Sequence, residues 1–375
     1  MTNQLAGSVV RGLELPISKL VLGTMTFGDT ANEATAGQMI DTALEAGITT
    51  IDTANVYVGG AAEKMLGRLL KNRRNDVVLA SKAGMPQADH GNYSPLSPQG
   101  LRNSVEGSLK RLDVESIDLY YLHQPDRNVS LESTLTTVAE LLSEGKIKAL
   151  GVSNFAAWQI ADVIAIAKEI GAPRPVVSQQ LYNLVARRVE EEYVEFASTH
   201  DIHTMVYNPL GGGLLTGRYT YESKPSEGRF GDSTIAEAYT RRYWDKQLFE
   251  AVKSLSSIAA LAGIAPFEMA LRWLVFRDSV GSVLLGASKV QQLRANIAAV
   301  ASGPLEPDVV DACDAVGVSL RGPMLWYRPR DVRVDQGCGG LLSELSGSAR
   351  TRVRRHCRRC RFSSRQCRDG RQGRL

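Results

Sequence analysis

The sequence alternates short apolar runs with longer amphipathic runs from about residue 20 to residue 300, and this alternation constrains the fold more than any other feature. Short runs of apolar or β-branched residues are typical of buried strands, whereas apolar residues three or four apart indicate helices. The predicted strands are residues 20–22, 50–52, 77–81, 117–121, 149–152, 177–180, 203–207 and 282–285. The predicted helices are residues 34–46, 63–70, 97–112, 131–144, 156–170, 189–200, 246–261, 266–276 and 290–300, with a long insertion after residue 207.

Eight strands that alternate with helices predict a parallel sheet, because each helical crossover returns the chain to the same edge. A closed (β/α)8 TIM barrel of the α/β class needs about 250 residues, and this chain has 375. The competing open, doubly wound sheet would carry Gly-x-Gly-x-x-Gly after its first strand. Residues 23–28 read Gly-Thr-Met-Thr-Phe-Gly instead, so the sequence favours the barrel. Arg11-Gly12, between Val9-Val10 and the run from Leu13 to Leu15, predicts an N-terminal β-hairpin that plugs the barrel.

We expect two parts: the barrel at residues 1–327 and a tail at residues 328–375, rich in Arg, Cys and Ser and disordered. Residues 350–375 contain eleven arginines and one acid, so the first 349 residues carry a net charge of −6 against +4 for the whole chain. A mildly acidic body argues against specific binding of nucleic acid, which needs a basic surface. The tail is interpreted as a noncatalytic extension, and a shifted reading frame is one hypothesis for its origin.

Cysteine usage and hydropathy bear on the compartment. Only Cys313 lies within the patterned region, which favours a reducing environment. In the tail, the run from His356 to Cys360 and then Cys367 invites a zinc site, but there is no second Cys-x-x-Cys pair and few apolar residues, so we expect no metal. No uninterrupted apolar stretch of about 18 residues and no signal-peptide pattern occur, so we expect a cytoplasmic protein without a membrane partner. The sequence does not indicate the oligomeric state.

Four proton-handling side chains follow three successive predicted strands. Asp52 and Tyr57 come after the second strand, Lys82 after the third and His123 after the fourth. Because the chemistry of such barrels collects at the carboxyl ends of the strands, these residues are expected to share one pocket. An ammonium beside a phenol favours the phenolate, and together with a histidine it would polarise and protonate a C=O group. Each residue alone has an ordinary interpretation as a turn, rim or solvated residue, but their joint position favours catalysis.

The chain resembles the aldo-keto reductase family in an ordered set of motifs. These are Asp-Thr-Ala-Asn-Val-Tyr at 52–57, Gly-Ala-Ala-Glu-Lys-Met-Leu-Gly at 60–67, Ile-Asp-Leu-Tyr-Tyr-Leu-His at 117–123, Gly-Lys-Ile-Lys-Ala-Leu-Gly-Val-Ser-Asn at 145–154 and Gly-Leu-Leu-Thr-Gly at 213–217. The resemblance covers about residues 15–300 and is closest to the branch of potassium-channel β-subunits and bacterial reductases. It implies an NADPH-dependent carbonyl reductase with Tyr57 as general acid, Lys82 as its tuner, Asp52 as the partner of Lys82, and His123 orienting the carbonyl.

By the same resemblance, Ser153, Asn154 and Gln179 would hold the nicotinamide carboxamide, and Tyr207 would stack on its ring. The loop over the pyrophosphate would follow the seventh strand, and the last strand–helix unit would hold the 2'-phosphate of NADPH. The cofactor residues implied in these segments and after the first strand are Thr24, Asn208, Leu210, Gly211, Leu214, Gly217, Arg218, Gly286, Ser288, Lys289, Gln292 and Asn296. Two departures from the family are Ser288, where many relatives have arginine, and Ala295, where many have an acid. Without the resemblance, Ser153-Asn154 would be a helix cap and Tyr207 a rim aromatic.

The substrate is predicted only as a small carbonyl compound. The pocket would draw on Phe27, Tyr57, Pro86, Gln124, Trp158 and residues 324–326, which suits many carbonyls, and keto sugars of deoxysugar metabolism are an alternative. A second hypothesis is a nucleotide-sensing regulatory or channel-associated subunit with the same fold. A third is a lyase that uses Lys82 as a Schiff base, which the paired Asp52 disfavours by keeping the lysine charged.

Overall fold

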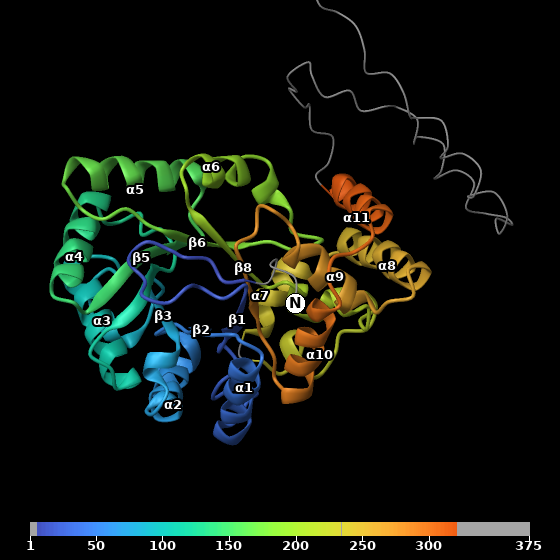
Figure 1. Cartoon of the computed structure of the whole chain (residues 1–375), viewed down its shortest axis with the longest axis horizontal. Helices are drawn as coiled ribbons and strands as arrows, with labels where there is room; N and C mark the ends of the chain where they lie inside the picture. Colours follow the sequence, from blue (N-terminus) through green and yellow to red (C-terminus); the bar gives the residue numbers. More distant parts are fainter. Residues whose placement is uncertain (1–5, 234, 321–375) are drawn as a thin grey trace, which may run out of the picture. The chain divides into compact units, whose positions relative to one another are not determined.

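A computed structural model describes residues 6–233 and 235–320 of the chain and shows eight parallel strands closed into a barrel. Figure 1 shows the strands at the centre with helices around them. Each strand pairs with the next, and β8 returns to β1 through Leu20 opposite Val283 and Leu22 opposite Leu285. The predicted TIM barrel is therefore confirmed. The strands are β1 (Leu20–Gly23), β2 (Thr50–Asp52), β3 (Val78–Ala83), β4 (Ile117–Leu122), β5 (Ile147–Ser153), β6 (Val177–Leu181), β7 (His203–Tyr207) and β8 (Ser282–Leu285).

The helices that cover the barrel begin where the sequence provides caps. Asn32, Ser97, Ser130 and Asp245 each accept a hydrogen bond from a backbone N–H in the first turn, which satisfies a donor left open at a helix start. The α-helices among the described residues are α1 (Glu33–Glu45), α2 (Ala61–Leu70), α3 (Pro98–Leu112), α4 (Leu131–Ser143), α5 (Ala157–Glu169), α6 (Tyr193–Thr199), α7 (Ala236–Tyr243), α8 (Lys246–Leu261), α9 (Pro266–Val275), α10 (Val290–Ala301) and α11 (Pro307–Leu320).

Three helices differ from the sequence-based prediction. The helix predicted at residues 189–200 begins only at Tyr193, because residues 188–190 form a 3-10 turn in which Glu190 is tied to Arg187 by an ion pair of 2.7 Å. Helix α7 lies inside the insertion after β7, where the sequence is too polar to show an apolar period. Helix α11 was also not predicted; it begins with Pro307 at its first position, a residue that suits a helix start.

Apolar side chains pack in two layers. One layer lies between strands and helices, and the other fills the barrel interior with Val21, Ala80, Leu119, Val177 and Leu284 among others. This alternation of faces follows from the two-residue period of a strand. It places neighbouring residues of β3 on opposite faces, which matters for the site below.

The predicted N-terminal hairpin is present as a tight turn closed by one antiparallel bridge. Ser8 and Ile17 exchange two backbone hydrogen bonds of 2.8 and 2.9 Å, and the turn lies at Arg11-Gly12. Val10 and Ile17 are buried with the side chains of the barrel interior. The hairpin therefore plugs the N-terminal end of the barrel, as predicted.

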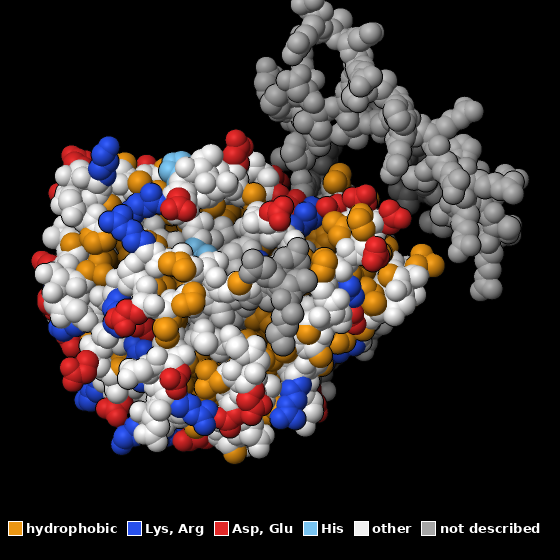
Figure 2. Space-filling view, viewed as in Figure 1, with side chains coloured by type: hydrophobic (Ala, Val, Ile, Leu, Met, Phe, Trp, Pro, Cys, Tyr) orange, Lys and Arg blue, Asp and Glu red, His pale blue; other side chains and the backbone are white. Residues whose placement is uncertain are grey.

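The predictions for the tail, its cysteines and the pocket residues 324–326 fall outside the residues that the structure describes. No single helix among residues 6–233 and 235–320 is long and apolar enough to cross a membrane, although α8 and α9 together reach the length and hydropathy across a bend of 93°. On the face drawn in Figure 2, acidic and basic side chains are interspersed, without one continuous patch of either sign.

Candidate active site

The four predicted catalytic residues meet at the carboxyl end of the barrel. Asp52 ends β2, Lys82 lies near the end of β3, His123 follows β4, and Tyr57 begins the short 3-10 segment after β2. Asp52 and Lys82 have no exposed side-chain surface, and His123 is 8% exposed. The ring centroids of Tyr57 and His123 are 6.2 Å apart and nearly perpendicular. The four side chains therefore lie close together, as expected from the sequence.

The ammonium of Lys82 has three oxygen neighbours. It pairs with the carboxylate of Asp52, donates to the backbone oxygen of Thr53 at 2.7 Å, and lies 3.4 Å from the hydroxyl of Tyr57. Gln179 donates to the second carboxylate oxygen of Asp52 at 2.8 Å. Two side chains thus fix Asp52, and Asp52 in turn fixes the ammonium beside the phenol.

Burial and charge act in opposite directions on this pair. Burial raises the pKa of the Asp52 carboxyl, against the charge of Lys82 and the hydrogen bonds from Lys82 and Gln179. Burial likewise lowers the pKa of the Lys82 ammonium, and the charge of Asp52 opposes this. Because removing either charge would leave the other uncompensated in a buried place, the pair is expected to stay ionised together.

The pKa of the Tyr57 phenol is raised well above its usual value. The sequence led us to expect that Lys82 would ease the loss of this proton, but burial dominates the net result. Burial is the largest cause, the negative charge of Asp52 adds to it, and the positive charge of Arg229 opposes it. The phenol is therefore protonated at neutral pH, which is the form that a proton donor needs.

His123 is neutral at neutral pH. Burial lowers the pKa of its imidazole to about 3, and the charge of Lys82 acts in the same direction. Its backbone is fixed by a 2.7 Å hydrogen bond to the oxygen of Ala83 and by a 2.9 Å bond from Asn154. Its Nδ1 is buried and has no hydrogen-bond partner among the described residues. A neutral ring with an open nitrogen can donate or accept a hydrogen bond at the pocket.

The residues implied for a carboxamide form one connected group beside these four. Ser153 donates to the backbone oxygen of Gln179 at 3.0 Å, and Asn154 lies next to it in the left-handed conformation, with φ of 61°. Tyr207 donates to the side-chain oxygen of Asn154 at 2.7 Å. The ends of β5, β6 and β7 are thus joined to Asp52 through Gln179.

The segment after β7 is shaped by glycine. Gly211, Gly212 and Gly213 all have positive φ, of 58°, 71° and 98°, so residues with a β-carbon would be strained there. Asn208 holds this turn, because its side-chain oxygen accepts a 2.8 Å bond from the N–H of Gly212. Leu210, Leu214, Gly217 and Arg218 surround the same turn, with Leu214 buried and Gly217 also at positive φ.

Two arginines of the insertion were missed by the sequence-based interpretation. Arg229 and Arg242 lie on the ring of Tyr239 at 5.3 and 5.8 Å from its centroid. Burial raises the pKa of Tyr207, while the charge and a hydrogen bond of Arg242 act against that rise. With Arg218, these cations form no ion pair within residues 6–233 and 235–320. Only the three-dimensional fold brings them to the pocket, because the insertion has no periodic pattern.

The remaining cofactor candidates lie at the β1 and β8 ends. Ser288 donates to Gln292 at 3.1 Å, and Lys289 stands exposed at the start of α10. Gly286 is exposed and Asn296 is buried. Thr24 has no exposed surface and donates its hydroxyl to the backbone oxygen of Asp52 at 3.0 Å.

Among the predicted substrate residues, Phe27 does not fit. Its side chain is fully buried in the core between strands and helices, so it does not line an open mouth. Trp158 at the start of α5 is 58% exposed, and Pro86 is also exposed. Gln124, directly after His123, is partly exposed.

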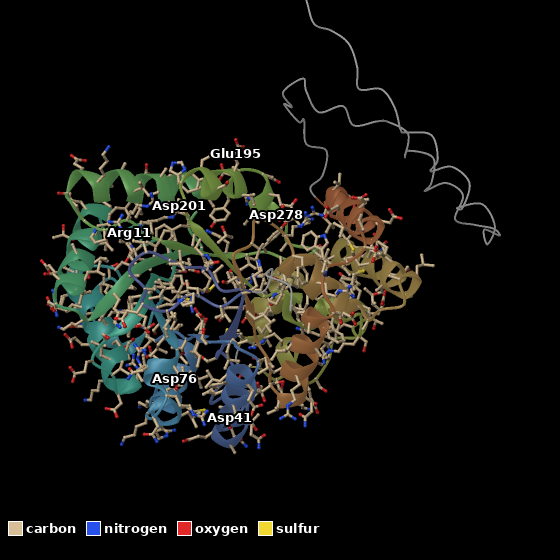
Figure 3. All side chains as sticks on the ribbon, in the orientation of Figure 1. Arg11, Asp41, Asp76, Glu195, Asp201 and Asp278 are labelled. Carbon is tan, nitrogen blue, oxygen red and sulfur yellow. The ribbon has the colours of Figure 1, made fainter. Side chains whose placement is uncertain are left out.

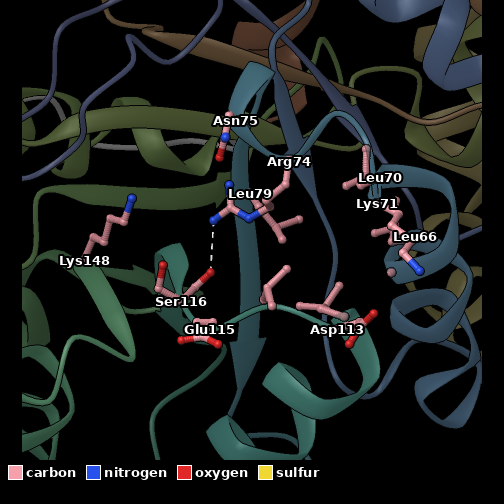
Figure 4. Close-up of a pocket in the computed structure, with 13 residues that line it drawn as sticks. Leu66, Leu70, Lys71, Arg74, Asn75, Leu79, Asp113, Glu115, Ser116 and Lys148 are labelled. Atoms are coloured by element: carbon pink, nitrogen blue, oxygen red, sulfur yellow. Dashed lines mark hydrogen bonds between the residues drawn. The ribbon is translucent and has the colours of Figure 1, made fainter.

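Other hollows lie away from these residues. A cavity of about 340 Å³ lies between α2 and the connection from α3 to β4, and there Arg74 donates to the backbone oxygen of Ser116 at 3.0 Å (Figure 4). Arg74 is also paired with Asp118 at 2.8 Å, so its charge is already compensated. Figure 3 labels charged side chains such as Asp201 and Asp278 in the connections that lead into β7 and β8. These features lie at the opposite end of the strands from Lys82.

No group of three or more His, Cys, Asp or Glu side chains within the described part of the chain is placed to hold a metal ion.

Comparison with known proteins agrees with the geometry. The model of the aldo/keto reductase family matches residues 19–318. The chain is 39% identical over 307 residues to human "Aldo-keto reductase family 7 member A3", a match that covers 78% of this chain and 91% of that protein. It is 36% identical over 307 residues to rat "Aflatoxin B1 aldehyde reductase member 2", covering 78% and 82%. It is 32% identical over 311 residues to the rice "Probable voltage-gated potassium channel subunit beta", covering 80% and 93%.

Proposed function

Because the chain belongs to the aldo/keto reductase family, we propose that it reduces an aldehyde or ketone to an alcohol, with NADPH as the reductant and Tyr57 as the proton donor. One observation carries the proposal. The protonated hydroxyl of Tyr57 lies 3.4 Å from an ammonium that a buried carboxylate fixes in place. Reduction of a carbonyl needs a proton at the oxygen as negative charge develops there, and this arrangement provides it.

The residues of the pocket suit a dinucleotide. Ser153, Asn154 and Gln179 offer amide and hydroxyl groups to a carboxamide, and Tyr207 offers an aromatic face. Arg218, Arg229 and Arg242 surround the glycine turn without a carboxylate partner among the described residues, so their charges are free to meet a diphosphate. Ser288 and Lys289 at the start of α10 suit a 2'-phosphate, because free N–H groups and the helix dipole favour an anion there. Thr24, Gly286, Gln292 and Asn296 line the same end and remain proposed contacts.

The bound cofactor would supply a hydride to the carbonyl carbon. The chain's own residues would handle the oxygen. His123, neutral and fixed through its backbone, would donate a hydrogen bond to the carbonyl oxygen and orient it. Tyr57 would give its proton to that oxygen, and the ammonium of Lys82 would stabilise the phenolate left behind. Asp52 would keep Lys82 charged throughout.

The substrate class is proposed more broadly. Partly exposed Gln124 and exposed Trp158 at the rim combine a polar and an aromatic surface, which suits carbonyl compounds that carry a ring, keto sugars included. Rat and human relatives are named as reductases of an aflatoxin aldehyde. Consumption of NADPH with a panel of aromatic aldehydes, aliphatic aldehydes and nucleotide-linked keto sugars tests the proposal. Turnover of at least one class supports it, and no turnover of any class under saturating NADPH contradicts it.

A second candidate is a regulatory subunit that senses the nucleotide, favoured by the likeness to the rice potassium-channel subunit. Stopped-flow mixing of the NADPH-bound protein with an aldehyde distinguishes the two. Oxidation of the bound NADPH within seconds of mixing supports an enzyme. Bound NADPH that stays reduced supports the regulatory role.

A further inference from the structure

A chain of ion pairs connects the turn of Tyr57 to the loop after β3. Glu63, near the start of α2, has no exposed side-chain surface. One of its oxygens accepts a bond from the hydroxyl of Ser81 at 2.5 Å, and the other accepts one from Arg111 of α3 at 2.8 Å. Arg111 then holds Asp89 with two parallel bonds of 2.7 and 2.6 Å. Such bidentate pairs are among the more strongly directional contacts in proteins.

This network contacts β3 on the face opposite to the side chain of Lys82. Ser81 directly precedes Lys82 on β3, and the strand alternation turns Ser81 toward the helices while Lys82 faces the pocket. Glu63 therefore holds the outer face of β3 at Ser81, next to the residue whose ammonium projects from the inner face. Its negative charge also favours the charged form of Lys82, although burial and Asp52 affect the pKa of that lysine more.

The same network packs against the residues that follow Tyr57. Val58 has φ of 49° and ψ of 42°, a left-handed conformation that is strained for a β-branched residue and persists only where its surroundings hold it. Gly60, two residues on, also has positive φ, and a β-carbon there would lie 2.8 Å from Cδ of Arg111. Arg111 thus closes the space behind the strained turn.

At its other end, the network reaches back to the same turn. Asp89 lies in a short 3-10 segment, and its N–H donates to the side chain of Gln87 at 2.6 Å. The amide of Gln87 donates to the backbone oxygen of Asn55 at 3.1 Å, two residues before Tyr57. Residues 55 to 60 are therefore held from both sides, by Arg111 and by Gln87.

We propose that Glu63, Arg111 and Asp89 are positioning residues that hold the strained turn of Tyr57 in register with Lys82, so that the proton donor is aligned before substrate binds. The inference rests on the proposed function for its effect on turnover. A small misplacement of a reacting group costs up to about 100-fold in rate. Disruption of the network therefore reduces proton delivery and leaves the cofactor contacts of β5, β6 and β7 in place.

The test compares variants along the network with a matched control on the same helix. Asp89→Asn weakens the outer link at a partly exposed site, Glu63→Gln removes the inner charge while keeping the shape, and Arg111→Lys keeps the charge but loses the fork. Arg102→Met is the control, because Arg102 of α3 also pairs with two acids, Glu140 and Glu144, but on the exposed surface. All variants are compared at a temperature where each is fully folded.

Two measurements are made on the full chain. For the NADPH-bound enzyme, kcat is expected to fall about 10- to 100-fold in the network variants, with unchanged affinity for NADPH and a larger isotope effect from deuterium at C4 of NADPH. Arg111→Lys is expected to keep an intermediate kcat, and Arg102→Met to match the wild type. A wild-type kcat and isotope effect in Asp89→Asn and Glu63→Gln would overturn the inference.

The second measurement does not depend on turnover. Amide hydrogen exchange at residues 55–60 is expected to accelerate in Asp89→Asn, although Asp89 lies on another loop, and to stay unchanged in Arg102→Met. The amides of Asn55, Tyr57 and Gly59 are hydrogen-bonded in the structure, so their exchange reports opening of the turn. If exchange accelerates but the wild type shows no turnover, the positioning network stands and the proposed function fails. If exchange at residues 55–60 is unchanged, the network does not hold the turn.

Discussion

Removal of the ammonium at position 82 should destabilise the fold, and a second substitution should restore part of the loss. Lys82→Met keeps a long unbranched side chain but removes the charge that faces Asp52, Thr53 and Tyr57. The carboxylate of Asp52, without exposed surface, then retains only the hydrogen bond from Gln179. Breaking a buried pair by removing one partner costs about 3–5 kcal/mol of unfolding free energy.

The double variant Asp52→Asn with Lys82→Met removes both charges of this buried pair. The backbone oxygen of Thr53 is still left without its hydrogen-bond donor, which lowers the free energy of unfolding by about 1–3 kcal/mol. We therefore expect the double variant to be more stable than Lys82→Met alone by about 2 kcal/mol. The sign with pH follows from the same reasoning. Without Lys82, burial raises the pKa of Asp52 in the folded protein above its value in the unfolded chain. Lys82→Met therefore gains stability as the pH falls through the range between these two pKa values.

Urea unfolding followed by tryptophan fluorescence, at neutral pH and at roughly pH 5, measures both effects. The gap between the single and the double variant should be largest at neutral pH and narrow at the lower pH. If the double variant is less stable than the wild type by the sum of the losses measured for Asp52→Asn and Lys82→Met alone, the two residues are not a coupled buried pair and the reasoning is refuted.

Three further predictions concern the pocket. Because burial and Lys82 lower the pKa of His123 to about 3, its NMR imidazole signals should show a neutral ring at roughly pH 5, and the protein should lose stability as pH falls from about 6.5 toward 3; a titration near 6.5 would contradict this. Gly212→Ala should weaken NADPH binding in calorimetry, because its β-carbon would stand 2.6 Å from the ring of Tyr239 at a φ of 71°; unchanged affinity would show that the turn is not a cofactor contact. Lys289→Met should raise the Kd for NADPH about tenfold and leave that for NADH unchanged, and equal losses for both would remove the proposed 2'-phosphate contact.

The strands could be predicted closely from the sequence because they are short runs, most of them rich in apolar or β-branched residues, between longer amphipathic stretches. Asp52 and Tyr207 end their strands as predicted. Helix starts were also predictable where a capping side chain such as Ser130 marks them. These features are local, so a pattern of a few residues contains the information.

The missed features are not local. The link between Glu63 and Arg111 joins residues 48 apart, and that between Arg111 and Asp89 joins residues 22 apart, without any period that relates them. Arg229 approaches Tyr57 from an insertion with no regular pattern. The raised pKa of Tyr57 was missed for the same reason, because burial depends on packing that a strand-by-strand interpretation does not describe.

The most direct test of the central claim is kcat of Tyr57→Phe with a carbonyl substrate of the wild type, measured together with the Kd for NADPH. The substitution removes one hydroxyl and keeps the ring. We expect a loss of kcat of about 100-fold or more, as for removal of a general acid, with NADPH binding retained. Wild-type kcat in this variant would contradict the assignment of Tyr57 as the proton donor.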